Sequence, residues 1–168
     1  AQFRSFVAGE LQVALTSPDN VLAYRFDPAN PLGERLDARI VAGLDRGMGL
    51  GLYARPGLTA ADLDGAVVGV DVPTSGFALA LYALADRLGV DRSRYRLEAL
   101  GSTPRRLEAL LAGDCDVTML NAGNELLAEA AGCVRLATAR DHLTPYLGTV
   151  VAVVGDAHLE RATPLTAA

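Results

Sequence analysis

The chain contains no lysine, and all fifteen of its basic residues are arginine. Without a lysine amine the protein cannot form a lysine Schiff base, so that type of covalent catalysis is excluded. The arginines are not gathered into a cluster, and the formal net charge is −5. Nucleic-acid binding needs basic side chains on one face to neutralise phosphates, so the composition argues against a nucleic-acid partner.

Histidine and cysteine are scarce, with two residues of each. Neither His142 nor His158 has a cysteine or a second histidine at metal-ligand spacing, so we expect no metal site and no cofactor. Two roles are open for Cys115 and Cys133. They would either form one disulfide in an oxidising compartment or remain two small buried apolar side chains. The choice stays open at this stage because pairing depends on the distance between their Cα atoms.

Long apolar runs are missing too, and the longest candidate, residues 149–154, is far below the roughly 20 residues that span a bilayer. The sequence has no Gly-x-Ser-x-Gly nucleophile elbow and no Gly-rich loop ending in Gly-Lys-Ser/Thr, which excludes those hydrolase and phosphate-loop classes. Asp114 and Asp116 lie in a strand-entry turn, where a solvated acidic pair is more common than a general acid and base. We therefore expect a protein that is not an enzyme.

What the chain does contain is a short internal repeat. Residues 8–20 (AGELQVALTSPDN) and residues 112–124 (AGDCDVTMLNAGN) both pass from a glycine through an acidic turn to an apolar strand and then to polar residues. Each copy predicts a helix that stops at the glycine, a strand, and a second helix that begins after the polar residues. The repeat therefore predicts two related lobes that face each other across a ligand.

The remaining pattern is typical of an α/β fold with a 51% hydrophobic composition that can build a core. Strands are predicted at residues 11–16, 39–44, 50–55, 66–70 (a buried, parallel-type strand), 95–100, 115–120, 134–138 and 149–154. Helices are predicted at residues 2–8, 18–24, 77–88, 104–112, 125–131 and 156–161, with a helical turn at 59–63. Three glycines in residues 47–51 predict a hinge.

Three segments in order carry a family resemblance: residues 56–70 (PGLTAADLDGAVVGV), residues 74–76 (TSG) and residues 110–117 (LLAGDCDV). They resemble the second-lobe motifs of type II periplasmic-binding-protein folds. Within these folds the chain is similar to substrate-binding proteins of ABC importers, in the branch that takes sulfonates, nitrate, taurine or thiamine-pyrimidine precursors. The resemblance implies two lobes, with lobe two nearly complete and lobe one truncated, because family members are near twice this length.

The resemblance also implies the lobe boundaries. Residues 1–47 would form part of lobe one, residues 48–154 lobe two, and residues 155–168 a return to lobe one. Neither end of the chain resembles a natural domain boundary, and the sequence leaves open whether the chain is a fragment.

The turn after the strand at residues 66–70 is the first candidate ligand site. Thr74, Ser75 and Gly76 precede a helix whose first amides lack intrahelical partners, and a hydroxyl, a glycine and the helix dipole there favour a carboxylate, sulfonate or phosphate. Ordinary N-capping needs the same residue types, so both roles remain open. Phe77 is either an aromatic stacking partner of the ligand or part of the core.

The repeated strand ends supply the other candidates. The polar residues there that would read the ligand are Thr16, Ser17 and Asn20 in the first copy and Asn121 and Asn124 in the second. Helix capping and turn formation are again the alternative roles. Asp45 ends a strand beside the hinge, where it would contact the ligand, pair across the lobes or remain solvated.

The resemblance implies the substrate-binding component of an ABC importer, which captures a small polar or anionic organic solute between hinged lobes. Its partners would be that solute and a membrane permease, and it would be an extracytoplasmic monomer, either periplasmic or a membrane-anchored lipoprotein. Two alternatives use the same fold, an enzyme of the pyrimidine-precursor or menaquinone-pathway type and the effector-sensing domain of a transcription regulator. A catalytic group in the cleft or an upstream helix-turn-helix would distinguish them.

Overall fold

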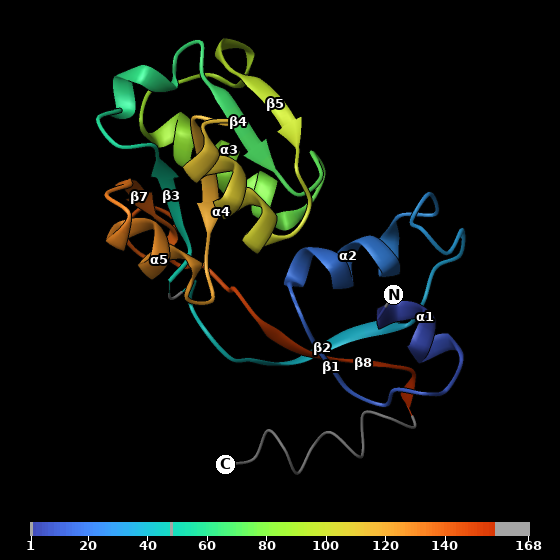
Figure 1. Ribbon diagram of the computed structural model, residues 1–168. Helices are drawn as coiled ribbons and strands as arrows, with labels where there is room; N and C mark the ends of the chain where they lie inside the picture. The colour runs from blue at the N-terminus through green and yellow to red at the C-terminus, as the bar shows by residue number, and fades with distance from the viewer. Residues whose placement is uncertain (1, 48, 157–168) are drawn as a thin grey trace. The chain divides into compact units, whose positions relative to one another are not determined.

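The computed structural model describes residues 2–47 and 49–156, and the chain divides into two compact units. Unit 1 contains the described residues up to Arg46 together with those from Leu147 onward, and unit 2 contains those from Gly47 to Tyr146. Figure 1 shows both units, each with its own sheet and its own helices. The chain therefore leaves unit 1, completes unit 2 and returns to unit 1.

Unit 1 is a small antiparallel sheet with two helices. Its elements are α1 (Gln2–Val7), β1 (Ala14–Thr16), α2 (Pro18–Phe26), β2 (Ala38–Gly43) and β8 (Val150–Val154). The strand order is β1-β8-β2, and β8 is antiparallel to both neighbours. Phe3 of α1 stacks on Tyr24 of α2 at 3.9 Å between ring centroids, and both helices pack on Ala14, Ala38 and Ala152, one residue from each strand. Small strand side chains thus let two aromatic-bearing helices lie close to the sheet.

The position of β8 differs from the expected lobe boundary at residue 154. Val150–Val154 reads as one apolar run, and such a run is compatible with a buried strand in either lobe. In the structure it pairs with Thr16 and Gly43 through Val150, so residues 147–154 belong to unit 1 and not to the expected lobe two. Hydrophobic pattern locates a strand in the sequence but does not choose its partner.

Unit 2 is built on a five-stranded mixed sheet. Its strands are β3 (Gly51–Ala54), β4 (Val67–Val70), β5 (Arg96–Ala99), β6 (Val117–Leu120) and β7 (Val134–Thr138), in the order β5-β4-β6-β3-β7. β4 runs parallel to β5 and β6, which confirms the parallel-type strand expected there, while β3 is antiparallel to β6 and β7. Its helices are α3 (Gly76–Arg87), α4 (Thr103–Ala112), α5 (Asn124–Ala130) and α6 (Ala139–His142), with 3-10 turns η1 (Ala60–Leu63) and η2 (Arg92–Arg94).

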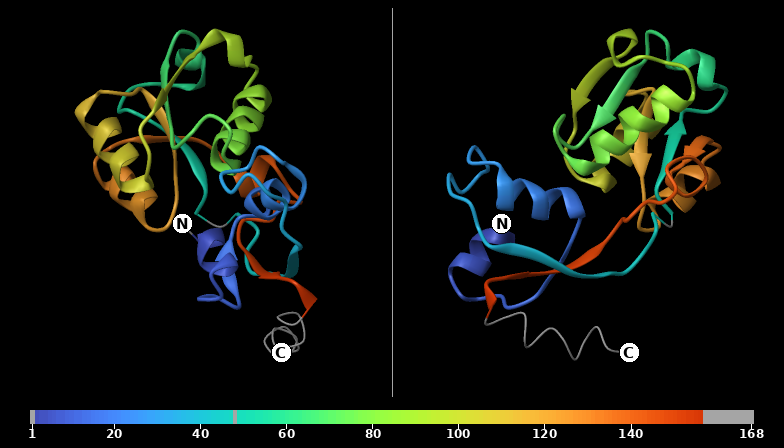
Figure 2. Two further views of the ribbon diagram at one scale, coloured as in Figure 1. Left: turned by 90° about the vertical axis from the view of Figure 1, so that its right-hand side faces the viewer. Right: turned by 180° about the vertical axis from the view of Figure 1, so that it is seen from behind.

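Helices cover both faces of this sheet. Leu81 and Leu84 of α3 pack with Leu52 and Val68 on one face. Leu107 and Leu110 of α4 pack with Ala128 of α5 and the strand residues Tyr53 and Leu120 on the other. Figure 1 shows α4 and α5 on the viewer's side of the sheet, and the reverse view in Figure 2 shows α3 on the opposite side. Unit 2 is therefore a three-layer α/β/α structure, as the alternating pattern predicted.

The two cysteines lie in the α4 and α5 layer of unit 2. Both are free thiols and both are buried, Cys115 at 1% and Cys133 at 8% exposure. Burial raises the pKa of Cys115 to about 11 and raises that of Cys133 as well. Of the two possibilities left by the sequence, the structure shows the pair of small buried side chains.

Two expectations fall partly on residues that the structure does not describe. The expected helix at residues 156–161 lies outside the described residues except for Asp156, and so does His158. Among the described residues no helix is long and apolar enough to cross a membrane.

Candidate functional site

The carboxyl ends of β4, β5 and β6 meet at one edge of the unit 2 sheet, because the three strands run parallel. Each strand end leads through a short turn to the start of a helix, α3, α4 or α5 respectively. In open α/β sheets small ligands bind outside the carboxyl ends of the strands. We call this part of unit 2 the carboxyl edge, and it holds six of the ten expected site residues.

At the start of α3, the Ser75 hydroxyl is already engaged by the chain. Its oxygen accepts a hydrogen bond from the Ala78 amide at 3.0 Å and donates one to the carboxylate of Asp71. This is N-capping, one of the two roles expected for this turn. Thr74 is exposed, and Gly76 is half-buried as the first residue of the helix.

Phe77 lies partly buried against the core on the α3 face of the sheet, as one of its two expected roles predicted. The Phe77 ring also faces the guanidinium of Arg106, with 5.9 Å between the ring centroid and Cζ. Arg106 was not among the expected site residues. Arg106 is only 2% exposed. A cation so deeply buried needs several partners, since an unpaired buried charge is strongly destabilising.

Arg106 finds these partners along the carboxyl edge. Its guanidinium donates to the carbonyl oxygens of Gly101 at 2.5 Å and Met119 at 3.2 Å, and to the Thr103 hydroxyl at 3.1 Å. Burial lowers the pKa of Arg106, while the negative charge of Asp71 opposes that shift. Arg106 therefore joins the turn that follows β5 to strand β6.

Asn121 and Asn124 belong to the same polar network. The Asn121 side-chain oxygen accepts from the Thr103 hydroxyl at 3.2 Å, and its backbone carbonyl accepts from the Asn124 amide at 3.0 Å. Both side chains are half-buried at the start of α5. The turn-forming role of Asn124 is thus present, and Asn121 connects the turns before α4 and α5.

The unit 1 candidates form a separate group at the end of β1. Thr16 is buried, and its hydroxyl accepts a hydrogen bond from the Asn20 side-chain amide at 3.0 Å. Ser17 is the N-cap residue of α2, yet its side chain makes no capping hydrogen bond. Asp45 lies after β2, where its backbone carbonyl accepts from the Gly148 amide at 3.1 Å. Thr16, Ser17 and Asn20 thus share one strand end, and Asp45 lies on a different segment of unit 1.

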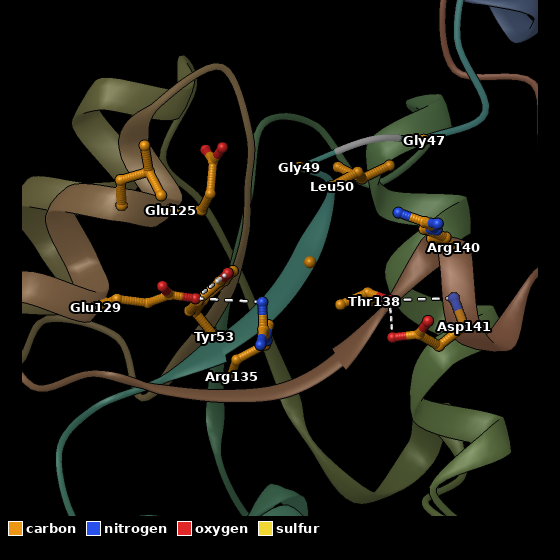
Figure 3. Close-up of a pocket in the computed structure, with 12 residues that line it drawn as sticks. Gly47, Gly49, Leu50, Tyr53, Glu125, Glu129, Arg135, Thr138, Arg140 and Asp141 are labelled. Atoms are coloured by element: carbon orange, nitrogen blue, oxygen red, sulfur yellow. Dashed lines mark hydrogen bonds and ion pairs between the residues drawn. The ribbon is translucent and has the colours of Figure 1, made fainter.

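A pocket of about 400 Å³ opens beside α5 in unit 2 (Figure 3). Its lining combines glycines of the expected hinge segment with charged side chains from three elements. The lining residues are Gly47, Gly49, Leu50, Gly51, Tyr53, Glu125, Leu126, Glu129, Arg135, Thr138, Arg140 and Asp141. Gly51 at the start of β3 pairs with Leu120 and Thr138, so the pocket reaches the carboxyl edge.

Carboxylates dominate the α5 wall of this pocket. Glu129 accepts from the Tyr53 hydroxyl at 2.9 Å and lies 3.5 Å from the Arg135 guanidinium. Burial, with the Glu129 carboxylate as a second cause, raises the pKa of Tyr53 to about 12. Glu125 accepts from the Gly123 amide at 2.8 Å, and Figure 3 shows its side chain on the same wall as Glu129. These hydrogen bonds and the ion pair hold the side chains of this wall in place.

The hinge glycines are required by their surroundings. Gly47 and Gly49 have φ of +74° and +75°, a conformation that other residues rarely adopt. A Cβ on Gly49 would lie 2.8 Å from Glu125 Oε1, and one on Gly47 would lie 2.6 Å from a ring carbon of Tyr146. Gly47 and Gly49 thus leave room for the side chains of Tyr146 and Glu125 beside this segment. Among the described residues, no group of histidine, cysteine and carboxylate side chains could hold a metal ion.

Neither a protein-family model nor a curated protein matches this chain by sequence. Solved structures do match it. The chain is similar to the periplasmic aliphatic sulphonate binding protein SsuA from Escherichia coli, with a TM-score of 0.73 and 16% identity over 98% of this chain and 54% of that one. A ligand-binding component of an ABC-type import system from Staphylococcus aureus has a TM-score of 0.73 and 16% identity over 97% and 54%.

A third structure, a Candida albicans protein described as having the generic periplasmic binding protein fold, has a TM-score of 0.63 and 16% identity over 98% of this chain and 53% of that one. The chain thus spans about half the length of the solved structures that it matches. Identities of this size report the fold and not the ligand. The order of strands and helices in the two units, together with these matches, shows that the chain has the type II periplasmic-binding-protein fold.

Proposed function

We propose that this chain is the solute-binding component of an ABC importer, and that it captures a small polar organic solute between two hinged lobes. The observation that carries the proposal is the carboxyl edge of unit 2, where Ser75, Thr103 and Asn121 lie at the starts of three helices. In open α/β sheets small ligands bind outside such an edge.

The strand end of unit 1 offers a second set of polar groups to a solute. Ser17 carries a hydroxyl without a capping bond, beside the Thr16 and Asn20 pair. A solute that contacts both strand ends would favour a closed arrangement, because only a ligand with greater affinity for one state shifts an equilibrium toward it. The closed form would then dock on a membrane permease, outside the cytoplasm and as a monomer.

Binding to the full chain tests this proposal. Thermal unfolding would be measured with polar amines, sulfonates, carboxylates, nitrate and pyrimidines, since a ligand that binds the native state raises the midpoint. Ser17→Ala is the diagnostic variant, because it removes a hydroxyl that makes no capping bond and so leaves stability nearly unchanged. We expect it to reduce the ligand-induced shift.

Ser5→Ala within α1 is the matched control, because it removes a hydroxyl of the same unit away from the strand end. It should leave the ligand-induced shift intact. The proposal fails if no solute of the panel raises the midpoint of the unchanged chain.

A further inference from the structure

The acidic residue Asp71 lies at the start of α3, the helix start at which the sequence predicted an anion site. It directly follows β4, is half-buried, and accepts the hydroxyl hydrogen of Ser75, the N-cap residue of α3. A carboxylate near a helix N-terminus interacts favourably with the helix dipole. The chain therefore supplies its own anion at the start of α3.

Arg106, the cation that could offset this charge, is already used. It is 2% exposed, and its hydrogen bonds go to Gly101, Thr103 and Met119. It acts on Asp71 through space, but the two side chains form no ion pair within 4 Å in the described part of the chain. Arg106 is thus too enclosed to serve as the receptor of a sulfonate or carboxylate.

The start of α5 repeats the arrangement. The Glu125 carboxylate accepts the hydrogen bond of the Gly123 amide at 2.8 Å, and Glu129 lies one helical turn further along the same pocket wall. Arg135 is paired with Glu129, and Arg140 is exposed on α6, across the pocket in Figure 3. The α5 wall of the pocket therefore carries two carboxylates, those of Glu125 and Glu129.

An anionic solute at this edge would place a second negative charge beside Asp71 or Glu125, and like charges at contact distance repel. A protonated amine would instead donate to a carboxylate oxygen in a charge-assisted hydrogen bond. We propose that the solute presents a protonated amine to unit 2 and that Asp71 selects it against sulfonates and carboxylates. This inference rests on the proposed solute-binding function and specifies its ligand class.

Matched solutes test the inference in the full chain. Pairs that share a carbon skeleton and differ in the head group, such as 2-aminoethanol and 2-hydroxyethanesulfonate, would be compared by thermal shift and calorimetric titration. The series would extend to longer amines, sulfonates and carboxylates of equal chain length. We expect binding by amines, and binding at least about tenfold weaker by the sulfonate and carboxylate of each set.

Three variants separate a selective role of Asp71 from a structural one. Asp71→Asn removes the charge and is expected to weaken amine binding about tenfold or more. Asp71→Glu keeps the charge and is expected to retain the preference for amines with reduced affinity. Asp114→Asn makes the same charge change at an exposed position before the amino end of β6, opposite the carboxyl edge. It should leave amine binding unchanged.

The outcomes divide clearly between this inference and the proposed function. Tight binding of sulfonates or carboxylates without amines overturns the inference and leaves the proposed function standing. Amine binding that survives in Asp71→Asn, with the folded state verified by circular dichroism, also overturns it. Failure of every solute of the panel to bind, nitrate and pyrimidines included, contradicts the proposed function itself, and the inference falls with it.

Discussion

Ser17 in unit 1 and Ser75 in unit 2 occupy the same local position, the N-cap of a helix that begins after a strand, yet their hydroxyls are used differently. Ser75 accepts from the Ala78 amide and donates to Asp71. Ser17 has an extended backbone that suits a cap, with φ of −83° and ψ of 151°, but no side-chain capping bond. The Ser75 hydroxyl caps its own helix, whereas the Ser17 hydroxyl makes no capping bond to α2.

The difference shows that residue type at a strand end does not identify a ligand contact. What matters is whether the surrounding chain already satisfies the polar atom, because a satisfied group gains little by exchanging one hydrogen bond for another. In unit 2 the carboxylate of Asp71 makes the serine structural. Asp71 itself, with a half-buried carboxylate at the carboxyl edge, becomes the better candidate for contact with a solute.

The largest effect is expected from removing the cation that holds the unit 2 turns together. Arg106→Ala would leave the carbonyls of Gly101 and Met119 without their buried donor, and Asp71 without its nearby positive charge. We expect the free energy of unfolding to fall by about 3 kcal/mol or more, measured by urea denaturation. Arg105→Ala, an exposed neighbour in α4, should change it by less than about 0.5 kcal/mol. Equal losses in the two variants would contradict the assigned role of Arg106.

The two serines provide the direct test of the comparison. Ser75→Ala removes the Ala78 cap, and a lost N-cap of this kind costs about 1 kcal/mol of stability. Ser17→Ala removes no capping bond and should cost only a few tenths of a kcal/mol. Paired urea unfolding curves measure both. If the order of the two losses were reversed, the contrast between the strand ends would disappear.

A smaller effect is expected on the stability that each unit loses on acidification, and on how that loss depends on salt. In unit 2, the Val67 amide and the Arg55 guanidinium lower the pKa of Asp116 below the ordinary 3.8. In unit 1, the Arg39 and Arg25 guanidinium groups lower the pKa of the exposed Asp37. A lowered pKa contributes stability that is present above pH 3.8 and is lost as the pH falls through the pKa of the folded state.

Salt distinguishes these two acid responses. Added salt screens the exposed pairs of Asp37, whereas the hydrogen bond from the Val67 amide to Asp116 persists. We therefore expect Asp116→Asn to reduce the loss of stability on acidification at both low and high salt. Asp37→Asn should do so only at low salt. Unfolding midpoints between pH 6 and pH 3 would show whether the two substitutions differ in this way.

Local sequence patterns predicted most of the individual elements. The strand Val134–Thr138 has the predicted bounds, and α3 begins one residue before its predicted start. The strand expected at residues 11–16 is shorter and covers only Ala14–Thr16. Leu11 packs on the unit 1 core, but it lies in the connection before the strand, where its backbone amide donates a hydrogen bond to the Ser5 carbonyl. Burial of an apolar side chain therefore does not by itself require a strand.

The candidate site was harder to predict because its contacts join residues that are distant in sequence. One signal was available for Arg106, which shares the buried face of α4 with Leu107 and Leu110 at helical spacing, an unusual place for a charged residue. No comparable signal marks Asp71. Its importance depends on the hydrogen bond that it accepts from the Ser75 hydroxyl, and on Arg106 being bound to backbone carbonyls of another turn and of β6.

The middle strand of the unit 1 sheet is the last strand of the described chain, and this arrangement has a consequence for synthesis on the ribosome. β1 and β2 emerge first but make no ladder with each other, since β8 lies between them. All five strands of unit 2 are complete before β8 appears. We therefore expect nascent chains that end before Val150 to protect the amides of unit 2 from hydrogen exchange while those of β1 and β2 still exchange freely.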